Sequence, residues 1–321
     1  MNPKINLLDV PILERKDING RRHYISRNDD GKIESGAVST TSINREAMPL
    51  NPYLEKWKFG LGELECKRVM DISAYFGTIE HIVLGDLTNG LPVMLGESDI
   101  EKYFGLNKLE KSEGGLPEYH NVRLPASANG KNYGYKRFRR DAISINQFIQ
   151  DHLVGDNIEV IGIELPLADF VRGFAGCMDL VVKVGLGEYD EETKLYEDYE
   201  YIIYDLKSGD GHYDEHDVQL NSYQRLLSNY LDIPLDKITM YDVHMKDWNA
   251  KTYKKYLDGT STTAPYKLVE VKYSEMFEYY LQGYYMRNEQ PNFDKKEIDY
   301  DCLVEDVVKQ FKGEVKWNLK S

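Results

Sequence analysis

The chain of 321 residues is expected to adopt an α/β (α+β) fold in which helices flank a central mixed β-sheet. The first observation is a group of apolar, β-prone runs at 159–167, 171–184 and 199–206. The second is a stretch with helical spacing at 214–230, which is followed by another β-prone run at 237–245. Because these strands and helices alternate, and helical patterns also precede them, they should form the layers of one fold.

The N-terminal half of the chain is predicted to be turn-rich at first and then helical. Residues 1–50 are polar, and the sequence Asn-Asp-Asp-Gly at 28–31 is typical of a hairpin turn. Over 51–90, apolar residues recur at three- and four-residue steps, which predicts one helix or two successive helices that end near Gly90. A further helix is expected at 142–153.

The β-prone runs of the second half are expected to pair as an antiparallel meander. The sequence Gly-Leu-Gly-Glu at 185–188, with the acidic stretch after it, should form a turn between two of these strands. A last helix is expected at 273–286. These patterns divide the chain into a turn-rich N-terminal segment (1–50), a helical part (51–155), a sheet-based core (156–250) and a C-terminal helical extension (251–321).

Composition and charge narrow the possible classes of protein. The formal net charge is −14, so non-specific binding to nucleic acid should be weak and salt-sensitive. No apolar run approaches the roughly 18–20 residues that cross a bilayer, and the first residues lack the features of a signal peptide. The three cysteines, Cys66, Cys177 and Cys302, are too few to hold an iron–sulfur cluster with four ligands from one chain. We therefore expect a cytoplasmic protein without membrane contact, in the host cytoplasm if a phage encodes it.

The most informative motif is an apolar β-prone run that carries Asp205 and Lys207. Side chains two residues apart on a strand point to the same face, so a carboxylate and an ammonium would lie side by side at the end of a buried strand. Burial of such a pair is costly unless it has a function. A second carboxylate, Asp179, lies in the preceding run, and Gln219 and Tyr223 would share one helix face. This combination favours a metal-dependent site that cleaves phosphodiester bonds.

Five short motifs follow one another along the chain in a distinctive order. They are Gly-Thr-x-x-His (Gly77 to His81), a strand glutamate (Glu164), Gly-x-x-Asp (Gly176 to Asp179), Asp-x-Lys (Asp205 to Lys207) and Gln-x-x-x-Tyr (Gln219 to Tyr223). Their order resembles the PD-(D/E)xK nuclease superfamily in its RecB-like branch, and is most similar to the mitochondrial genome maintenance exonucleases and related phage exonucleases. The Ser/Thr sequence at 38–41 and the Leu-Glu-Lys-Trp sequence at 54–57 are also similar to that branch. The iron–sulfur cysteines of some relatives are absent.

The resemblance implies a restriction-endonuclease-like core at 156–250, with the helical part at 51–155 arched over its cleft. It also implies a metal-dependent DNA exonuclease of replication, recombination or repair. Its partner would be single-stranded DNA or DNA with free ends.

The resemblance also assigns roles to the motif residues. A Mg²⁺ or Mn²⁺ ion would be held by Asp179, Asp205 and the backbone carbonyl of Leu206, because hard divalent ions prefer oxygen ligands. His81 would add an imidazole ligand, which favours Mn²⁺, and Glu164 could hold a second ion or its water. Lys207 would orient or deprotonate the attacking water. Gln219 and Tyr223 would hydrogen-bond to the site or to the DNA backbone.

A basic segment interleaved with aromatic residues precedes the core. Its cations, Lys131, Lys136, Arg137, Arg139 and Arg140, are suited to contact phosphates while neighbouring aromatic rings stack on bases. The alternative is a solvated face that leads from a loop into a helix.

A second motif offers a function of another class. His212, Glu215 and His216 match the His-x-x-Glu-His sequence of inverted zinc metalloproteases. That motif requires a helix, but Gly209 and Gly211 directly precede it and would break the first turn. A loop that leads into the next helix is therefore the favoured interpretation. Within the nuclease interpretation, an endonuclease of the same fold is the alternative. An inactive DNA-end-binding or scaffolding protein is a third class, against which the intact Asp179, Asp205 and Lys207 count.

Overall fold

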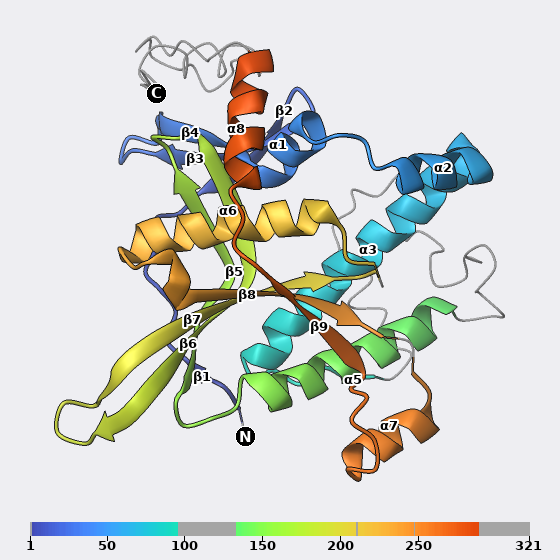
Figure 1. The fold of residues 1–321 in the computed structure, drawn as a ribbon, viewed down its shortest axis with the longest axis vertical. Coiled ribbons are helices and arrows are strands. Elements are labelled where there is room, and N and C mark those ends of the chain that lie inside the picture. Colours follow the sequence, from blue (N-terminus) through green and yellow to red (C-terminus); the bar gives the residue numbers. More distant parts are fainter. Residues whose placement is uncertain (1, 96–132, 210, 247, 289–321) are drawn as a thin grey trace.

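The computed structural model describes residues 2–95, 133–209, 211–246 and 248–288 (Figure 1). Its described strands form one mixed sheet with helices on both faces, which confirms the predicted fold class. The strands are β1 (Lys4–Ile5), β2 (Glu14–Ile18), β3 (Arg21–Arg27), β4 (Ile33–Ser39), β5 (Ile158–Asp169), β6 (Phe174–Asp190), β7 (Leu195–Lys207), β8 (Ile238–Met245) and β9 (Tyr266–Val271). The helices are α1 (Thr40–Ala47), α2 (Pro52–Leu61), α3 (Glu63–Thr88), α5 (Tyr133–His152), α6 (Asp214–Leu231), η2 (Leu235–Lys237), α7 (Ala250–Leu257) and α8 (Met276–Arg287). Among these described helices, none has the length and apolar composition that a membrane span requires.

Strand β6 is the centre of the sheet. It pairs antiparallel with β5 along one edge and with β7 along the other, and its first two residues pair in parallel with β4. Strand β7 pairs in parallel with β8, which pairs antiparallel with β9, so the order is β2-β3-β4-β6-β7-β8-β9. The short β1 pairs with β5. Because parallel neighbours need a crossover, α6 connects β7 to β8 across one face of the sheet.

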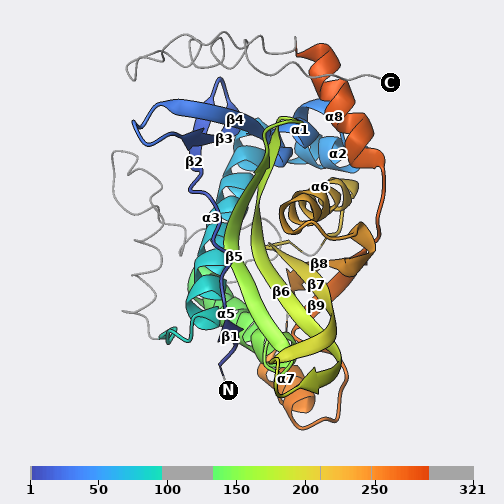
Figure 2. The same ribbon diagram turned by 90° about the vertical axis from the view of Figure 1, so that its left-hand side faces the viewer.

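The two faces of the sheet carry separate hydrophobic cores. Helices α3 and α5 cover one face, and α1, α6 and α8 cover the other (Figure 2). Successive side chains of β7 alternate between them, since Tyr204 packs with α3 and α5 whereas Ile203 packs with α6. Asp205 and Lys207 follow Ile203 by two and four residues and therefore emerge on the face that α6 covers.

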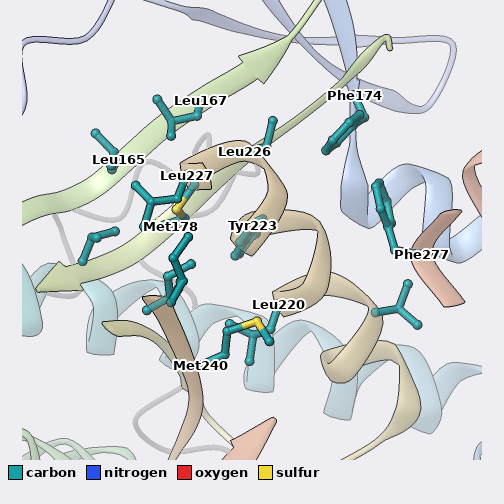
Figure 3. Packing of buried hydrophobic residues seen from close by; sticks show 14 of the residues in the cluster. Leu165, Leu167, Phe174, Met178, Leu220, Tyr223, Leu226, Leu227, Met240 and Phe277 are labelled. Carbon is teal, nitrogen blue, oxygen red and sulfur yellow. The ribbon is translucent and has the colours of Figure 1, made fainter. Parts of the chain in front are cut away.

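Helix α6 is held against the sheet by an apolar face. Its core residues Leu220, Tyr223 and Leu227 recur at three- and four-residue spacing, as the apolar face of an amphipathic helix requires. Burial of each large side chain contributes about 1.5–3 kcal/mol, so this contact fixes the helix firmly. Figure 3 shows the packing of Leu220, Tyr223, Leu226 and Leu227 of α6 with Leu165, Leu167, Phe174, Met178, Met240 and Phe277.

Several predicted elements lie where the sequence placed them. The stretch 51–90 forms two successive helices, α2 and α3, which meet at Gly62 with a φ of 79°. The hairpin turn at 28–31 joins β3 to β4, and Gly31 has a φ of 75° that suits glycine. Helices α6 and α8 also occur at the expected positions.

The ends of the described chain contain more sheet than predicted. The segment 1–50, expected to be turn-rich, contributes β1 to β4 and α1. The stretch expected to be a helical C-terminal extension contributes β9 between α7 and α8, and 289–321 lie outside the described residues. Four of the five residues of β2 are charged, and three of the seven residues of β3 are arginines, so the two sequences lack the apolar alternation of a typical strand.

The prediction of a turn at 185–188 was wrong, because these residues belong to β6. Strands β6 and β7 continue through this region and reverse five residues later, where the Lys194 amide donates to the Asp190 carbonyl. The Asp190 side chain accepts from the amides of Glu192 and Thr193, and such local bonds stabilise a turn. Gly187, with a φ of 75°, lies instead at an irregularity of the ladder.

Arg137 joins α5 to α3 and to the end of β7. Its guanidinium lies 3.1 Å from Glu80 and 3.2 Å from Asp141, and all three side chains are buried. It also donates to the Ser208 carbonyl at 2.8 Å and lies over the ring of Phe76. The segment from which it comes was expected to contact DNA. For Arg137 that prediction was wrong, because its single charge compensates the buried pair of Glu80 and Asp141, in which burial and the charge of Asp141 raise the pKa of Glu80 to about 8.

We predict that Arg137→Met lowers the free energy of unfolding by about 3–5 kcal/mol, because Glu80 and Asp141 would stay buried without their counter-charge. Urea denaturation of the two proteins measures the difference. Arg139→Met is the matched control, since Arg139 is exposed two residues further along α5. Equal stability of the Arg137 variant and the control would contradict a structural role for Arg137.

Candidate functional site

The candidate site forms where β6 and β7 separate. Their ladder ends at the Leu180–Tyr204 pair, and the Leu206 amide then donates to the Asp179 carboxylate at 2.6 Å. Beyond the last strand pair, β6 offers the Leu206 amide no backbone acceptor. The Asp179 side chain takes that place, so the buried amide keeps a hydrogen-bond partner. The same bond places Asp179 beside the segment that carries Asp205.

Asp205 and Lys207 begin a chain of polar contacts that runs onto α6. The two side chains form an ion pair, and the Lys207 ammonium donates to the Gln219 carbonyl oxygen at 3.0 Å. The Gln219 amide group donates to the Tyr223 hydroxyl at 2.7 Å and lies 3.5 Å from Asp205. The predicted pairing of Asp-x-Lys with Gln-x-x-x-Tyr therefore exists as direct contact.

His81, Glu164 and Asp179 form an acidic group on the other side of the separation. The His81 Nδ1 atom lies 2.9 Å from Glu164 Oε1 and 3.2 Å from Asp179 Oδ1. Glu164 of β5 lies opposite Asp179 of β6 in the register of the two strands. Its φ of 48° is a left-handed conformation, which is unfavourable for a non-glycine residue. Strain of this kind is concentrated at functional sites.

The electrostatics of the site follow from its burial. Burial raises the pKa of Asp205 to about 7; the charges of Asp179 and Asp242 act in the same direction, and Lys207 opposes them. Burial disfavours charge on His81, but Asp179 and Glu164 raise its pKa well above the ordinary value. Burial likewise opposes charge on Lys207, whereas Asp205 raises the pKa of Lys207. Lys207 is therefore an ammonium that donates and stabilises negative charge.

A pocket of about 700 Å³ contains the two groups. Its floor is formed by the separated ends of β6 and β7, and its walls by α3, by the start of α1 and by strands β2 and β3. It is lined by Arg15, Arg22, Tyr24, Ser39, Thr40, Thr41, Ser73, Ala74, Gly77, Thr78, His81, Ile82, Gly85, Asp86, Asn89, Glu164, Gly176, Cys177, Asp179, Asp205, Leu206, Lys207, Ser208, Gln219 and Tyr223. All the predicted catalytic and metal-binding residues are thus among its lining residues.

The predicted nucleic-acid-binding residues divide differently. Gln219 and Tyr223 line the pocket, whereas Arg139 and Arg140 of α5 do not. Lys131 lies outside the described residues, as does the side chain of Lys136. Arg140 lies 3.0 Å from Asp141. DNA binding by the rest of the basic segment therefore stays a prediction, whereas Arg137 is buried in its ion pairs.

Two cations of the pocket were missed by sequence reasoning. Arg15 and Arg22 lie on the N-terminal hairpin of β2 and β3, which brings positive charge to a pocket with several carboxylates. The Nε atom of Arg22 is buried and has no hydrogen-bond partner among the described residues. Arginine suits phosphate recognition because its planar group donates several parallel hydrogen bonds. The positions of these two arginines in the sequence did not predict a place in the site. Only the pairing of β4 with β6 brings this hairpin to the pocket.

The donor atoms of the site fit a hard divalent cation. His81, Glu164 and Asp179 each offer one ligand atom, and these atoms lie within 4.8 Å of one another. Asp205 is not in this group but interacts electrostatically with Asp179. Two carboxylates around one imidazole need a positive charge between them, which a protonated His81 or a bound cation supplies.

The protease motif adopts a different arrangement from the one that metalloproteases need. Helix α6 begins at Asp214, so His212 precedes it and only Glu215 and His216 are helical. His212 and His216 both contact Asp242, whereas Glu215 is not in their cluster. The general base that a protease would require is therefore not beside the two histidines.

No protein-family model matches the chain, and a search of curated proteins found no significant match.

Gly176 allows β6 and α6 to approach each other at the site. A Cβ atom at this position would lie 2.3 Å from Cε1 of Tyr223, a distance that real contacts do not reach. We predict that Gly176→Ala destabilises the protein by about 1–3 kcal/mol, because Tyr223 must leave its position. It should also break the bond between Gln219 and Tyr223. Thermal unfolding measures the loss.

The matched control for this prediction is Gly60→Ala. Gly60 lies in α2, and a Cβ atom at this position would have no neighbouring atom within 4 Å. Alanine there should therefore be neutral or stabilising by up to about 1 kcal/mol. Unchanged stability of Gly176→Ala would show that Tyr223 is not tightly packed.

Proposed function

We propose that the protein is a metal-dependent nuclease that hydrolyses phosphodiester bonds, and that it acts as an exonuclease on single-stranded DNA ends. The observation that carries this proposal is the convergence of Asp179, Asp205 and Lys207 in one pocket, at the point where two strands separate. Such a site combines carboxylates for a cation with an ammonium that can stabilise developing negative charge. The resemblance of the motifs to PD-(D/E)xK exonucleases supports the same chemistry.

The carboxylates are suited to hold a Mg²⁺ or Mn²⁺ ion. Asp179 and Glu164 offer hard oxygen ligands, His81 adds a nitrogen, and Asp205 borders the group. A divalent ion bound there would polarise a phosphoryl oxygen and make its water more acidic. The ion would also lower the pKa of Asp205, because it favours the carboxylate form.

The remaining polar groups are suited to position the substrate and water. Lys207 is held between Asp205 and Gln219, so its ammonium has a fixed direction from which to orient a water or donate to a phosphoryl oxygen. Arg15 and Arg22 line the same pocket and are suited to bind backbone phosphates. Their local positive charge would offset the negative net charge of the chain.

We expect the protein with Mg²⁺ or Mn²⁺ to shorten linear single-stranded DNA progressively and to spare a covalently closed circle of the same sequence. Asp205→Asn and Lys207→Ala should each lower the rate by at least about 10²–10⁴-fold, because they remove groups that act at the reacting phosphate. Gel analysis of end-labelled DNA measures cleavage, and circular dichroism verifies the fold of each variant.

Glu215→Gln is the matched control and should retain full nuclease activity, whereas a zinc protease would require Glu215. Casein with Zn²⁺ tests the protease directly. Cleavage of the circle would identify an endonuclease of the same fold, and DNA binding without cleavage would identify an inactive end-binding protein. Normal cleavage by both site variants would refute the nuclease assignment.

A separate prediction concerns Arg15 and Arg22, the two arginines that line the pocket. Substitution of both Arg15 and Arg22 by Gln should raise the KM for single-stranded DNA. It should also reduce the slope of log affinity against log salt by about 1.4, because each lost phosphate contact accounts for about 0.7 on a single strand. Fluorescence anisotropy over a salt series measures this slope.

The paired control replaces Arg139 and Arg140 by Gln. Neither residue lines the pocket, so DNA that binds through the pocket leaves the salt slope unchanged in this variant, whereas DNA that follows the basic segment flattens it. A flattened slope in the control, with an unchanged slope in the Arg15 and Arg22 variant, would locate the DNA path along α5 instead.

A further inference from the structure

A second group of metal-ligating side chains lies beside the pocket, and none of its members lines the pocket. His212 and His216 come from the loop before α6 and from its first turn, and Asp242 and His244 come from β8. The register pairs Asp242 with Asp205 and His244 with Lys207. Two of the four residues therefore lie on the strand next to the proposed catalytic residues.

One carboxylate oxygen is the focus of the group. Asp242 Oδ2 lies 2.7 Å from His212 Nδ1, 2.7 Å from His216 Nδ1 and 3.6 Å from His244 Nε2. The four residues can each offer one ligand atom, and these atoms lie within 4.8 Å of one another. In a tetrahedral zinc site with bonds of about 2.0–2.2 Å, ligand atoms lie roughly 3.4 Å apart. Small side-chain rotations would thus bring all four atoms to one ion.

The tautomer of His244 directs a lone pair into this group. Its Nδ1 atom lies 2.7 Å from the Gly209 carbonyl, which can only accept, so Nδ1 carries the hydrogen. In the neutral ring, Nε2 then has a lone pair that faces Asp242. His244 is 1% exposed, and its Nε2 has no hydrogen-bond partner among the described residues. Asp242 is 0% exposed, and its Oδ1 atom also has none in that part of the chain.

His212 is oriented in the same way by a carboxylate. Its Nε2 atom lies 2.7 Å from Asp217 Oδ1, which can accept the ring hydrogen. The Nδ1 atom of the neutral ring is then an acceptor, yet it lies 2.7 Å from a second acceptor, Asp242 Oδ2. Two acceptors repel each other at this distance, so the pair is stable only with a second proton on the ring or with a metal ion that binds both atoms and holds them roughly 3.4 Å apart. Metal-bound histidines commonly have such an outer carboxylate or backbone carbonyl partner.

We propose that His212, His216, Asp242 and His244 bind one Zn²⁺ ion in a structural site. Three imidazoles and one carboxylate are typical zinc ligands, whereas Mg²⁺ and Ca²⁺ prefer all-oxygen sites. Four protein ligands close the coordination sphere, and this feature distinguishes structural from catalytic zinc.

The ion would connect β8 to the start of α6. Gln219, which contacts Lys207, lies three residues after His216 on this helix. The site would therefore hold the first turn of α6 in the position that the Lys207–Gln219 bond requires. This consequence for Gln219 rests on the proposed nuclease function, but zinc binding itself does not.

Zinc binding can be measured without an activity assay. The untagged full chain, purified without chelators and dialysed against excess Mg²⁺ to occupy oxygen-rich sites, should retain about one equivalent of zinc by mass spectrometry. His216→Gln and His244→Gln should lose it. Asp217→Asn should weaken binding about 10- to 100-fold, because it removes the partner that orients His212. His81→Gln and Glu215→Gln are matched controls and should retain the zinc.

A second measurement needs only the unmodified protein, so it tests the site even if the variants fail to fold. The apo form of the unmodified protein, titrated with Co²⁺, should develop the intense visible absorption of tetrahedral cobalt, and equimolar Zn²⁺ should abolish it. The proposal is overturned if the unmodified protein retains no zinc and shows no such spectrum, or if folded His216→Gln and His244→Gln retain zinc. Zinc binding without DNA cleavage would refute only the nuclease, and DNA cleavage without zinc binding would refute only this site.

Discussion

The architecture of the site depends on one hydrogen bond, from the Leu206 amide to the Asp179 carboxylate. Strands β6 and β7 stop pairing after Leu180 and Tyr204, and a buried amide without an acceptor there would cost about 1–3 kcal/mol. Asp179 supplies the acceptor with its side chain, so the strands can diverge and open a pocket between their ends. The same carboxylate contacts His81 with its other oxygen, and it therefore belongs to the backbone network and to the acidic group at once.

The charges at the site are close to one another and mostly buried. Asp205 is 2% exposed and lies near two other carboxylates, Asp179 and Asp242, so burial and repulsion both disfavour its charge. Lys207 and His81 compensate part of this negative charge. The neighbouring strands β7 and β8 thus carry one continuous polar layer between the sheet and α6. A layer of this kind is suited to bind cations, because cations relieve the repulsion between the carboxylates.

Close approach of the helices gives this layer its geometry. At Gly176 the sheet touches the ring of Tyr223, and at Gly77 a Cβ atom on α3 would lie 3.5 Å from the Ser208 hydroxyl at the end of β7. Thr40 at the start of α1 donates to the Ala175 carbonyl and accepts from Ser222 of α6. Three helices therefore meet at the end of the sheet where the acids lie, and the polar contacts between them position His81 and Gln219.

The sequence by itself determined the local elements and the chemistry of the motif residues. Apolar, β-prone runs predicted β5, β6, β7 and β8, helical spacing predicted α3 and α6, and the spacing of Asp205 and Lys207 put both on one face of a strand. These features are local, because they depend on the alternation of side chains along a few residues. The pairing of Asp205 with Lys207 could therefore be predicted from spacing alone, and the order of the motifs added Asp179 to it; the structure brings the three residues into one pocket.

Only the tertiary structure decided the features that depend on distant partners. Strands β2 and β3 have polar sequences, and it is the pairing of β4 with β6 that carries them, with Arg15 and Arg22, to the pocket. The basic sequence around Arg137 suggested a solvated, DNA-binding surface, but Glu80 and Asp141 bury its charge between two helices. Likewise, His212 and His216 found their partners on β8, about 30 residues away, instead of in a helix of their own. Charge and polarity in a sequence do not specify exposure, because a buried ion pair forms only when the fold brings both partners together.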